Sequence, residues 1–271
     1  MIGQRCVQQQ IRAEIESRSL ARFIILAGDV GSGRKTLAKE IARLVDADCV
    51  FVDKGVDAVR EVINQSYKIA SEVVYVLDGD NMSSAAKSAL LKVTEETPNK
   101  ARFILVVTDV EHTLPTLVSR ARVFRMDVYT QADIAAFAGS EDIRFANYCT
   151  NKREVDLLKA YGVDEFVDFV KLVVNNVAEV SSANAFKIED KIALKGEEDK
   201  YDMKIFLQAF RIECLANMQA SDAYYAKATY MGWINVTNQI LEDLRLSTIN
   251  KVSLFDKWIF NIRKEVKRAE G

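Results

Sequence analysis

The sequence has few prolines, scattered cysteines and one histidine, and each scarcity excludes a class of structure. Only two of the 271 residues are proline and both precede residue 120, so little interrupts helices in the second half. The single histidine, His112, cannot build a His-based metal site or a Ser-His-Asp triad alone. No Cys-x-x-Cys pair occurs, which argues against a zinc ribbon or a disulfide framework built from Cys6, Cys49, Cys149 and Cys214. We therefore expect reduced thiols and no metal site made from protein side chains of these types.

Excess charge and long apolar runs are also missing. Lys and Arg number 37 against 39 Asp and Glu, a formal net charge of -2, which argues against a freestanding basic nucleic-acid binder. No apolar run approaches the roughly 18 residues that a membrane span needs, and the opening "MIGQRCVQQQ" is too polar for a secretory signal. With 49% hydrophobic residues and a mean hydropathy of -0.05, the sequence predicts a soluble, cytoplasmic, globular protein with no membrane partner.

The first half of the sequence alternates between short apolar runs and segments with helical spacing. The apolar runs are continuous rather than alternating, which is typical of parallel strands buried on both faces of a sheet. This order predicts a doubly wound α/β domain over residues 1–128. Its expected strands are 22–28, 49–53, 73–79 and 102–108, and its expected helices are 35–45, 56–70 and 83–96.

The second half reads as helices joined by short polar turns. It predicts a small helical domain over 129–178 and a second all-helical domain over 179–271, with the polar stretch 187–202 as a linker or exposed loop. Aromatic and apolar residues around Trp233 and Trp258 follow helical spacing, so both tryptophans are expected in a core.

The stretch 28–36, "GDVGSGRKT", lies between a predicted strand and a predicted helix, where a phosphate-binding loop works. The pattern G-x-x-x-x-G-K-[ST] aligns with Gly28 and Gly33, but it places Arg34 in the lysine position and Lys35 in the hydroxyl position that binds Mg²⁺. One extra loop residue would return Lys35 and Thr36 to those roles, and a glycine-rich turn without ligand is a further alternative. Arginine binds phosphate as a planar fork rather than a compact charge, and lysine cannot ligate Mg²⁺. The candidate nucleotide-binding residues here are Gly28, Gly31, Ser32, Gly33, Arg34, Lys35 and Thr36.

A second motif, "VVYVLDGDN" (73–81), ends an apolar strand at Asp78. A carboxylate there is suited to lie near Mg²⁺ at the carboxyl edge of the sheet. ATPases of this general type carry a glutamate next, which activates the attacking water, whereas this chain has Gly79. Asp80 lies one residue too far along to be an obvious substitute. The motif therefore predicts that the chain lacks the general base for hydrolysis.

Together these segments resemble the clamp-loader branch of the AAA+ ATPases. "MIGQRCVQQQIRAEI" is similar to the opening segment of that family, which borders the adenine pocket. "FIILAGDVGSGRKTLAKEIAR" is similar to its phosphate loop, and "VVYVLDGDNMSSAAKSALLKVTEETP" to its Walker B strand and following helix. "ARFILVVTDVEHTLPTLVSRAR" is similar to its sensor-1 strand and Ser-Arg-Cys motif. The resemblance covers nearly all of the first domain, and it implies an AAA+ parallel-sheet P-loop domain, a helical lid domain and a C-terminal all-α collar domain.

The resemblance also implies roles for three residues. Thr108 stands at the sensor-1 position, and Arg153 weakly matches a sensor-2 arginine. Arg120, in Ser119-Arg120-Ala121, would be an arginine finger that stabilises charge on ATP bound to a neighbouring subunit. Alanine replaces the cysteine of the family motif, and an ordinary surface arginine at a helix end is the alternative for Arg120.

The irregular phosphate loop and Gly79 depart from the family pattern, whereas the motif around Arg120 is retained. The resemblance therefore implies a clamp-loader subunit that has lost its own ATP hydrolysis and acts through Arg120. The implied partners are the other subunits of a hetero-pentamer, a sliding clamp and primer-template DNA, the last contacted mostly indirectly. The implied ligand is ATP or ADP with Mg²⁺, although the irregular loop leaves its binding open. An active ATPase subunit that uses Lys35 and Thr36 is the main alternative, and a small-substrate P-loop kinase is a third hypothesis.

Overall fold

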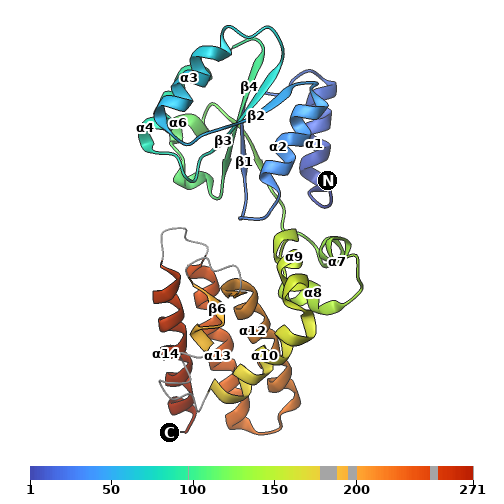
Figure 1. Cartoon of the computed structure of the whole chain (residues 1–271), viewed down its shortest axis with the longest axis vertical. Helices are drawn as coiled ribbons and strands as arrows, with labels where there is room; N and C mark the ends of the chain where they lie inside the picture. The colour runs from blue at the N-terminus through green and yellow to red at the C-terminus, as the bar shows by residue number, and fades with distance from the viewer. Residues whose placement is uncertain (97, 178–187, 195–199, 245–249, 271) are drawn as a thin grey trace. The chain divides into compact units, whose positions relative to one another are not determined.

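The computed structural model describes residues 1–96, 98–177, 188–194, 200–244 and 250–270. The chain divides into two compact units, Met1–Thr130 and Gln131–Gly271 (Figure 1). Within the described residues, no helix combines the length and apolar character needed to cross a bilayer.

The first unit is built on a parallel five-stranded sheet with the order β2-β3-β4-β1-β5. This order places β1, β4 and β3 side by side, so the loops that follow them meet at one edge of the sheet. The strands are β1 (Phe23–Ala27), β2 (Asp48–Val52), β3 (Val73–Asp78), β4 (Ala101–Val107) and β5 (Arg122–Arg125).

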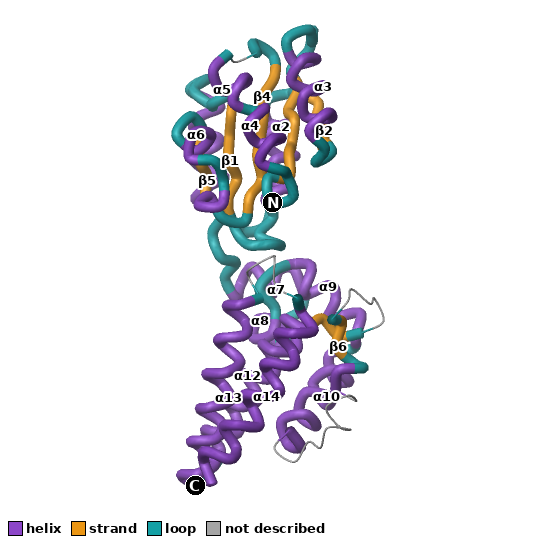
Figure 2. The backbone as a smooth tube through the Cα atoms, turned by 90° about the vertical axis from the view of Figure 1, so that its left-hand side faces the viewer, coloured by secondary structure: helices purple, strands orange, loops and turns teal. Residues whose placement is uncertain are grey.

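Helices cover both faces of this sheet (Figures 1 and 2). Because side chains alternate along a strand, Ile24 and Leu26 of β1 pack on one face, with α1 and α2, while Ile25 packs on the other, with α3 to α6. The apolar strands β1, β3 and β4 are thereby buried on both sides, as predicted. The prediction is wrong for β2, which lies at the edge of the sheet and leaves Val50 and Phe51 exposed. The helices are α1 (Arg5–Glu16), α2 (Arg34–Leu44), α3 (Val56–Ser66), α4 (Ser84–Ala89), α5 (Leu91–Glu95) and α6 (Pro115–Val118), with a 3₁₀ turn η1 (Val110–His112).

Several local features of this unit differ from the sequence prediction. Helices α1 and α6 were not predicted, and α3 ends at Ser66 rather than at residue 70. The expected helix 83–96 is divided at Leu90, where the Leu90 amide bonds to the Lys87 carbonyl and the Leu90 carbonyl accepts from the Val93 amide, so the turn tightens. Strand β5 was not predicted, because four residues with an arginine at each end carry too little apolar pattern.

The second unit is mainly helical and has an aromatic core. Trp258 is fully buried, stacks edge-on against Phe206 and Phe210, and donates its indole N–H to Thr237 Oγ1 at 3.0 Å. Trp233 is 3% exposed, so the prediction of two core tryptophans is confirmed. The helices are α7 (Gln131–Ala138), α8 (Ile143–Tyr148), α9 (Lys152–Tyr161), α10 (Val163–Asn176), α12 (Met203–Ala220), α13 (Tyr224–Asp243) and α14 (Lys251–Glu270).

The stretch 187–202, expected as a linker or exposed loop, is partly buried where it is described. Strands β6 (Ile192–Ala193) and β7 (Tyr201–Asp202) pair in parallel, and Ile188 and Leu194 are also buried. Isolated apolar residues within a polar stretch supply these contacts, which composition alone did not indicate. The predicted boundary between residues 178 and 179 lies outside the described residues, and the division into domains 1–128, 129–178 and 179–271 stays a prediction.

Candidate functional site

The glycine-rich loop leaves β1 at Gly28 and enters α2 at Arg34, with Gly33 as the residue before the helix. Gly33 has φ +90°, a left-handed conformation that favours glycine. A Cβ added there would lie 2.5 Å from Met1 Cε and 2.7 Å from Tyr129 Oη. Any side chain would therefore collide with both ends of the unit.

Two residues outside the predicted set hold this loop in place. The buried Gln4 donates its Nε2 to the Asp127 carbonyl and accepts the Asp127 amide at Oε1, both at 2.6 Å. Tyr129 donates its hydroxyl to the Ser32 carbonyl at 2.9 Å. Gln4 also donates Nε2 to the Ser32 carbonyl of the loop at 3.4 Å. Gln4 lies in the opening segment that resembles the family, so its motif was visible, whereas its partner Asp127 is 123 residues away.

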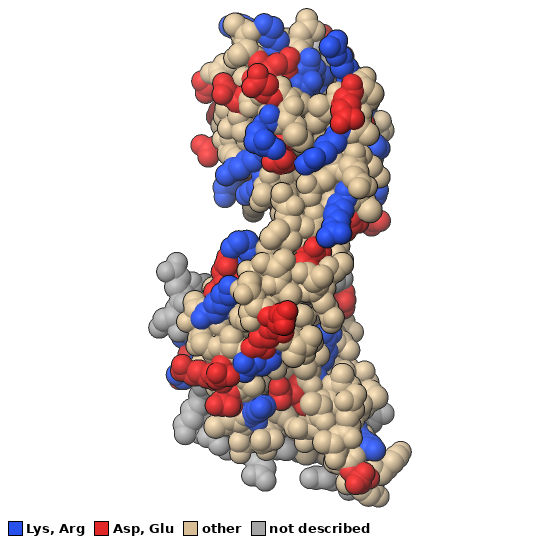
Figure 3. Space-filling model, turned by 90° about the vertical axis from the view of Figure 1, so that its right-hand side faces the viewer, with Lys and Arg blue, Asp and Glu red and all other residues tan. Residues whose placement is uncertain are grey.

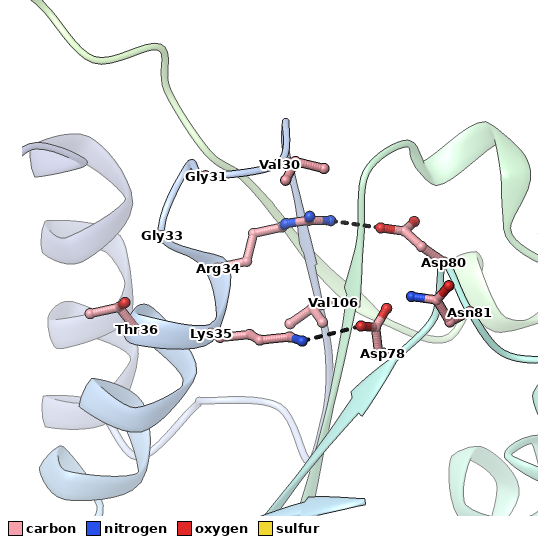
Figure 4. Close-up of a pocket in the computed structure, with 10 residues that line it drawn as sticks. All are labelled: Val30, Gly31, Gly33, Arg34, Lys35, Thr36, Asp78, Asp80, Asn81 and Val106. Atoms are coloured by element: carbon pink, nitrogen blue, oxygen red, sulfur yellow. Dashed lines mark hydrogen bonds and ion pairs between the residues drawn. The ribbon is translucent and has the colours of Figure 1, made fainter. Parts of the chain in front are cut away.

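The loop and the ends of the neighbouring strands enclose a cavity of about 410 Å³ (Figure 4). Arg34 and Lys35 reach across it from α2 toward Asp80 and toward Asp78, the last residue of β3, while the Thr36 side chain points the other way. The lining residues are Val30, Gly31, Gly33, Arg34, Lys35, Thr36, Asp78, Asp80, Asn81 and Val106.

Asp80 is the centre of the first polar cluster, although the sequence placed it one residue too far along to replace the missing glutamate. Its carboxylate accepts from Arg34 Nη1 at 3.1 Å, from the Thr108 amide at 2.7 Å and from the Thr108 hydroxyl at 2.5 Å. Burial raises the pKa of Asp80, but the hydrogen bonds from Thr108 and Arg34 outweigh it and leave the pKa below its usual 3.8. The residues predicted for the phosphate-binding and sensor-1 positions are thus both bound to a carboxylate of this chain.

Replacing Asp80 with asparagine is expected to lower the free energy of unfolding by about 1 kcal/mol near neutral pH, because the charged acceptor for Arg34 and Thr108 is lost. The folded-state pKa lies below the ordinary 3.8, so this contribution is present above that value and is lost as the pH falls through the lowered pKa. Urea unfolding of both proteins at a series of pH values measures the difference. The difference in the free energy of unfolding should be constant from about pH 5 upward and shrink below about pH 4. A difference that grows on acidification would contradict the lowered pKa of Asp80.

The second cluster is the pair formed by Lys35 and Asp78. Lys35 Nζ donates to Asp78 Oδ2 at 3.2 Å, with 59% and 31% of the two side chains exposed. This matches the alignment without an extra residue, in which Lys35 takes the hydroxyl position of the loop. Mg²⁺ in such a site needs oxygen ligands, and here an ammonium group stands beside the carboxylate. The donor set therefore does not fit Mg²⁺.

Gly79 occupies the position of the missing glutamate and is itself buried. A Cβ added there would lie 2.7 Å from Val107 Cγ1 and 2.9 Å from Leu105 Cδ1, and both of these side chains are buried in the core. The position therefore has no room for a side chain, and it lacks the glutamate that the family pattern carries there.

Comparisons with known proteins agree with this architecture. Residues 46–130 match the family described as DNA polymerase III, delta subunit. The chain is 27% identical over 169 residues to DNA polymerase III subunit gamma of Buchnera aphidicola (subsp. Schizaphis graminum), an alignment that covers 51% of this chain and 47% of the relative. It is 43% identical over 72 residues to DNA polymerase III subunit delta' of Escherichia coli (strain K12), covering 25% and 22% of the two chains. The chain spans about half the length of the first curated relatives it matches.

A solved structure shares the fold. The DNA polymerase III gamma subunit-related protein of Thermotoga maritima aligns with a TM-score of 0.52 at 14% identity, over 96% of this chain and 99% of that one. The chain has an AAA+ fold and is similar to clamp-loader proteins. Its relatives include both DNA polymerase III subunits and a replication factor C small subunit, that of Haloarcula marismortui, 27% identical over 145 residues that cover 47% of this chain and 45% of the relative.

The other two residues predicted from the clamp-loader resemblance are not among the residues that line the cavity. Arg120 follows α6, donates Nη1 to the Thr116 carbonyl at 3.0 Å and approaches Glu95 Oε1 to 3.6 Å through Nη2. Its side chain is 42% exposed. Arg153 is an exposed residue of α9 in the second unit. Their roles stay predictions.

Proposed function

We propose that this chain is a delta-prime-like subunit of a DNA polymerase III clamp loader, which helps to place a sliding clamp on primed DNA. It does not hydrolyse ATP itself, and it donates Arg120 to ATP bound by a neighbouring subunit. The observation that carries the proposal is a contrast. The cations of the nucleotide-site cavity are paired with the chain's own carboxylates, whereas the arginine in the retained "LPTLVSRAR" segment is exposed.

The loss of hydrolysis is supported by three features of the cavity. The general-base position is Gly79, which has no room for a side chain. Arg34 is bound to Asp80, so the cation expected to contact phosphate already has an anionic partner. Lys35 replaces the hydroxyl that would help to bind Mg²⁺. Phosphoryl transfer depends on positioning and charge stabilisation, so the combined changes remove most of what the site would supply.

The role in trans is supported by the surroundings of Arg120. The exposed Arg120 guanidinium makes a 3.6 Å ion pair with Glu95 and an exposed hydrogen bond to the Thr116 carbonyl. It can reorient toward a phosphate at little cost, because exposed pairs contribute little. A neighbouring ATP would gain a bidentate donor where negative charge develops.

The proposed partners are the other subunits of a hetero-pentamer, the sliding clamp and primer-template DNA, in the cytoplasm. The exposed Tyr224 and Tyr225 at the start of α13, 79% and 71% exposed, offer aromatic surface of the kind that interfaces use. Basic and acidic side chains are interspersed on the visible face of each unit (Figure 3), which favours mostly indirect DNA contact.

The isolated chain is expected to show no ATP hydrolysis above background, and Lys35→Ala is expected to leave this result unchanged, because Lys35 pairs with Asp78 rather than positioning phosphate and metal. A steady-state phosphate-release assay with Mg²⁺ makes the measurement, and Lys39→Ala on the same helix is a matched control.

An active ATPase subunit, gamma-like or replication factor C small subunit-like, is the second candidate. It is favoured by the longer alignments with gamma subunits, 169 and 188 residues, than with the delta' subunit, 72 residues. Appreciable turnover that depends on Lys35 and not on Lys39 would select it and overturn our preference.

A further inference from the structure

The position beside Asp78 is filled by a cation that belongs to the chain. In an AAA+ site of the usual kind, the aspartate that ends this strand and a hydroxyl at the start of the following helix share a Mg²⁺. Here the residue at the hydroxyl position is Lys35, and its ammonium group lies 3.2 Å from the Asp78 carboxylate (Figure 4). The residue that follows Lys35, Thr36, carries a hydroxyl, but its side chain points away from Lys35 and Asp78.

The charges of the cavity are also balanced without any ligand. Arg34 and Lys35 contribute two positive charges, and Asp78 and Asp80 contribute two negative charges, so the four groups sum to zero. Each cation contacts one carboxylate. A divalent cation entering here would find both carboxylates already paired and would meet two neighbouring cations of like sign.

We propose that the Lys35 ammonium takes the place of Mg²⁺ beside Asp78, so that this cavity excludes divalent cations whether or not a nucleotide is present. Two effects weaken metal binding. The missing hydroxyl removes one oxygen ligand, and the ammonium group repels the metal from the remaining one. Any nucleotide that enters the cavity would bind without metal, against Lys35 and Arg34.

This inference concerns the isolated chain and goes beyond the proposed function, because neither Arg120 nor a neighbouring subunit takes part. It predicts that one substitution opens the site. Lys35→Thr removes the ammonium group and places a hydroxyl at the first turn of α2, on the side that faces Asp78. Lys35 is exposed, so the substitution removes little packing.

The test uses Mn²⁺ as a paramagnetic substitute for Mg²⁺ on the full ¹⁵N-labelled chain, with and without ADP. In the wild type, the amide signals of Gly79 and Asp80 should keep their intensity as Mn²⁺ is added. In Lys35→Thr, the same signals should be lost selectively while signals from the second unit remain. Lys39→Thr is the matched control, since Lys39 lies one turn later on α2 over the Phe51 ring, and it should behave as the wild type.

Selective loss of the Gly79 and Asp80 signals in the wild type would overturn the inference, because the metal would then bind despite Lys35. Equal behaviour of Lys35→Thr and the wild type would overturn it too, since Lys35 would not be what excludes the metal. The double variant Lys35→Thr/Asp78→Asn should restore the signals; persistent loss would place the metal elsewhere and contradict the role of Asp78. The amide spectrum itself reports whether each variant is folded, and none of these outcomes depends on Arg120 or on clamp-loader assembly.

Discussion

Replacing Arg120 with alanine in an assembled clamp loader is expected to slow ATP hydrolysis at the neighbouring subunit's site by about 10³-fold or more, the usual range for an arginine finger. Total turnover of the complex should fall by the share which that site contributes. The physical reason is that a guanidinium stabilises charge that develops only in the transition state. Steady-state phosphate release by the reconstituted complex measures the effect.

Assembly should be unaffected by this substitution. The Arg120 side chain is 42% exposed and its ion pair with Glu95 is long, so its removal costs little folding stability. Size-exclusion chromatography with light scattering checks that the complex keeps its subunits. Arg60→Ala is a matched control, because Arg60 is an exposed arginine of the same unit with one distant ion pair, to Asp57 at 3.9 Å.

Arg120→Lys separates charge from shape. Lysine retains a positive charge but lacks the planar fork that binds two phosphate oxygens, so it should recover only a small part of the activity. Unchanged turnover in Arg120→Ala would remove the arginine-finger role and leave Arg120 as a surface arginine at a helix end. A complex that falls apart would instead assign Arg120 to assembly.

The sheet and the phosphate loop could be predicted because local sequence carries their physical cause. The run "VVYVLD" is apolar at every position but its last, a pattern typical of a strand buried on both faces. "GDVGSGRKT" places glycines where the backbone needs positive φ, as at Gly33. Each of these signals is complete within a few residues.

The partners inside the cavity could not be predicted, because they depend on strand order and register. Asp78 is paired with Val106 in the register of β3 and β4, so Asp80 and Thr108 emerge two residues further on at the same level. Sequence reasoning counted Asp80 along the chain and found it one residue too far from the usual position. In the folded sheet its neighbour is Thr108, 28 residues away, and the carboxylate binds there.

Replacing Gly79 with glutamate would restore the residue that an AAA+ hydrolase carries at this position, yet we expect no gain of ATP hydrolysis and a loss of about 3 kcal/mol or more in the free energy of unfolding. The new Cβ would lie 2.7 Å from Val107 and 2.9 Å from Leu105. These side chains belong to the buried cluster on the face opposite α2, so the carboxylate would enter apolar surroundings and not the cavity.

Urea unfolding and phosphate release measure the two effects of the Gly79 substitution. Gly55→Glu is the matched control, because nothing lies within 4 Å of a Cβ added at Gly55, which precedes α3 with φ −65°. Its cost should stay below about 1 kcal/mol. The loss in the free energy of unfolding for Gly79→Ala should lie between those of Gly79→Glu and Gly55→Glu, because a single methyl group already contacts Val107. A stable Gly79→Glu protein that hydrolyses ATP would contradict both the closed position and the loss of catalysis, since Leu105 and Val107 would then have to move aside at no cost.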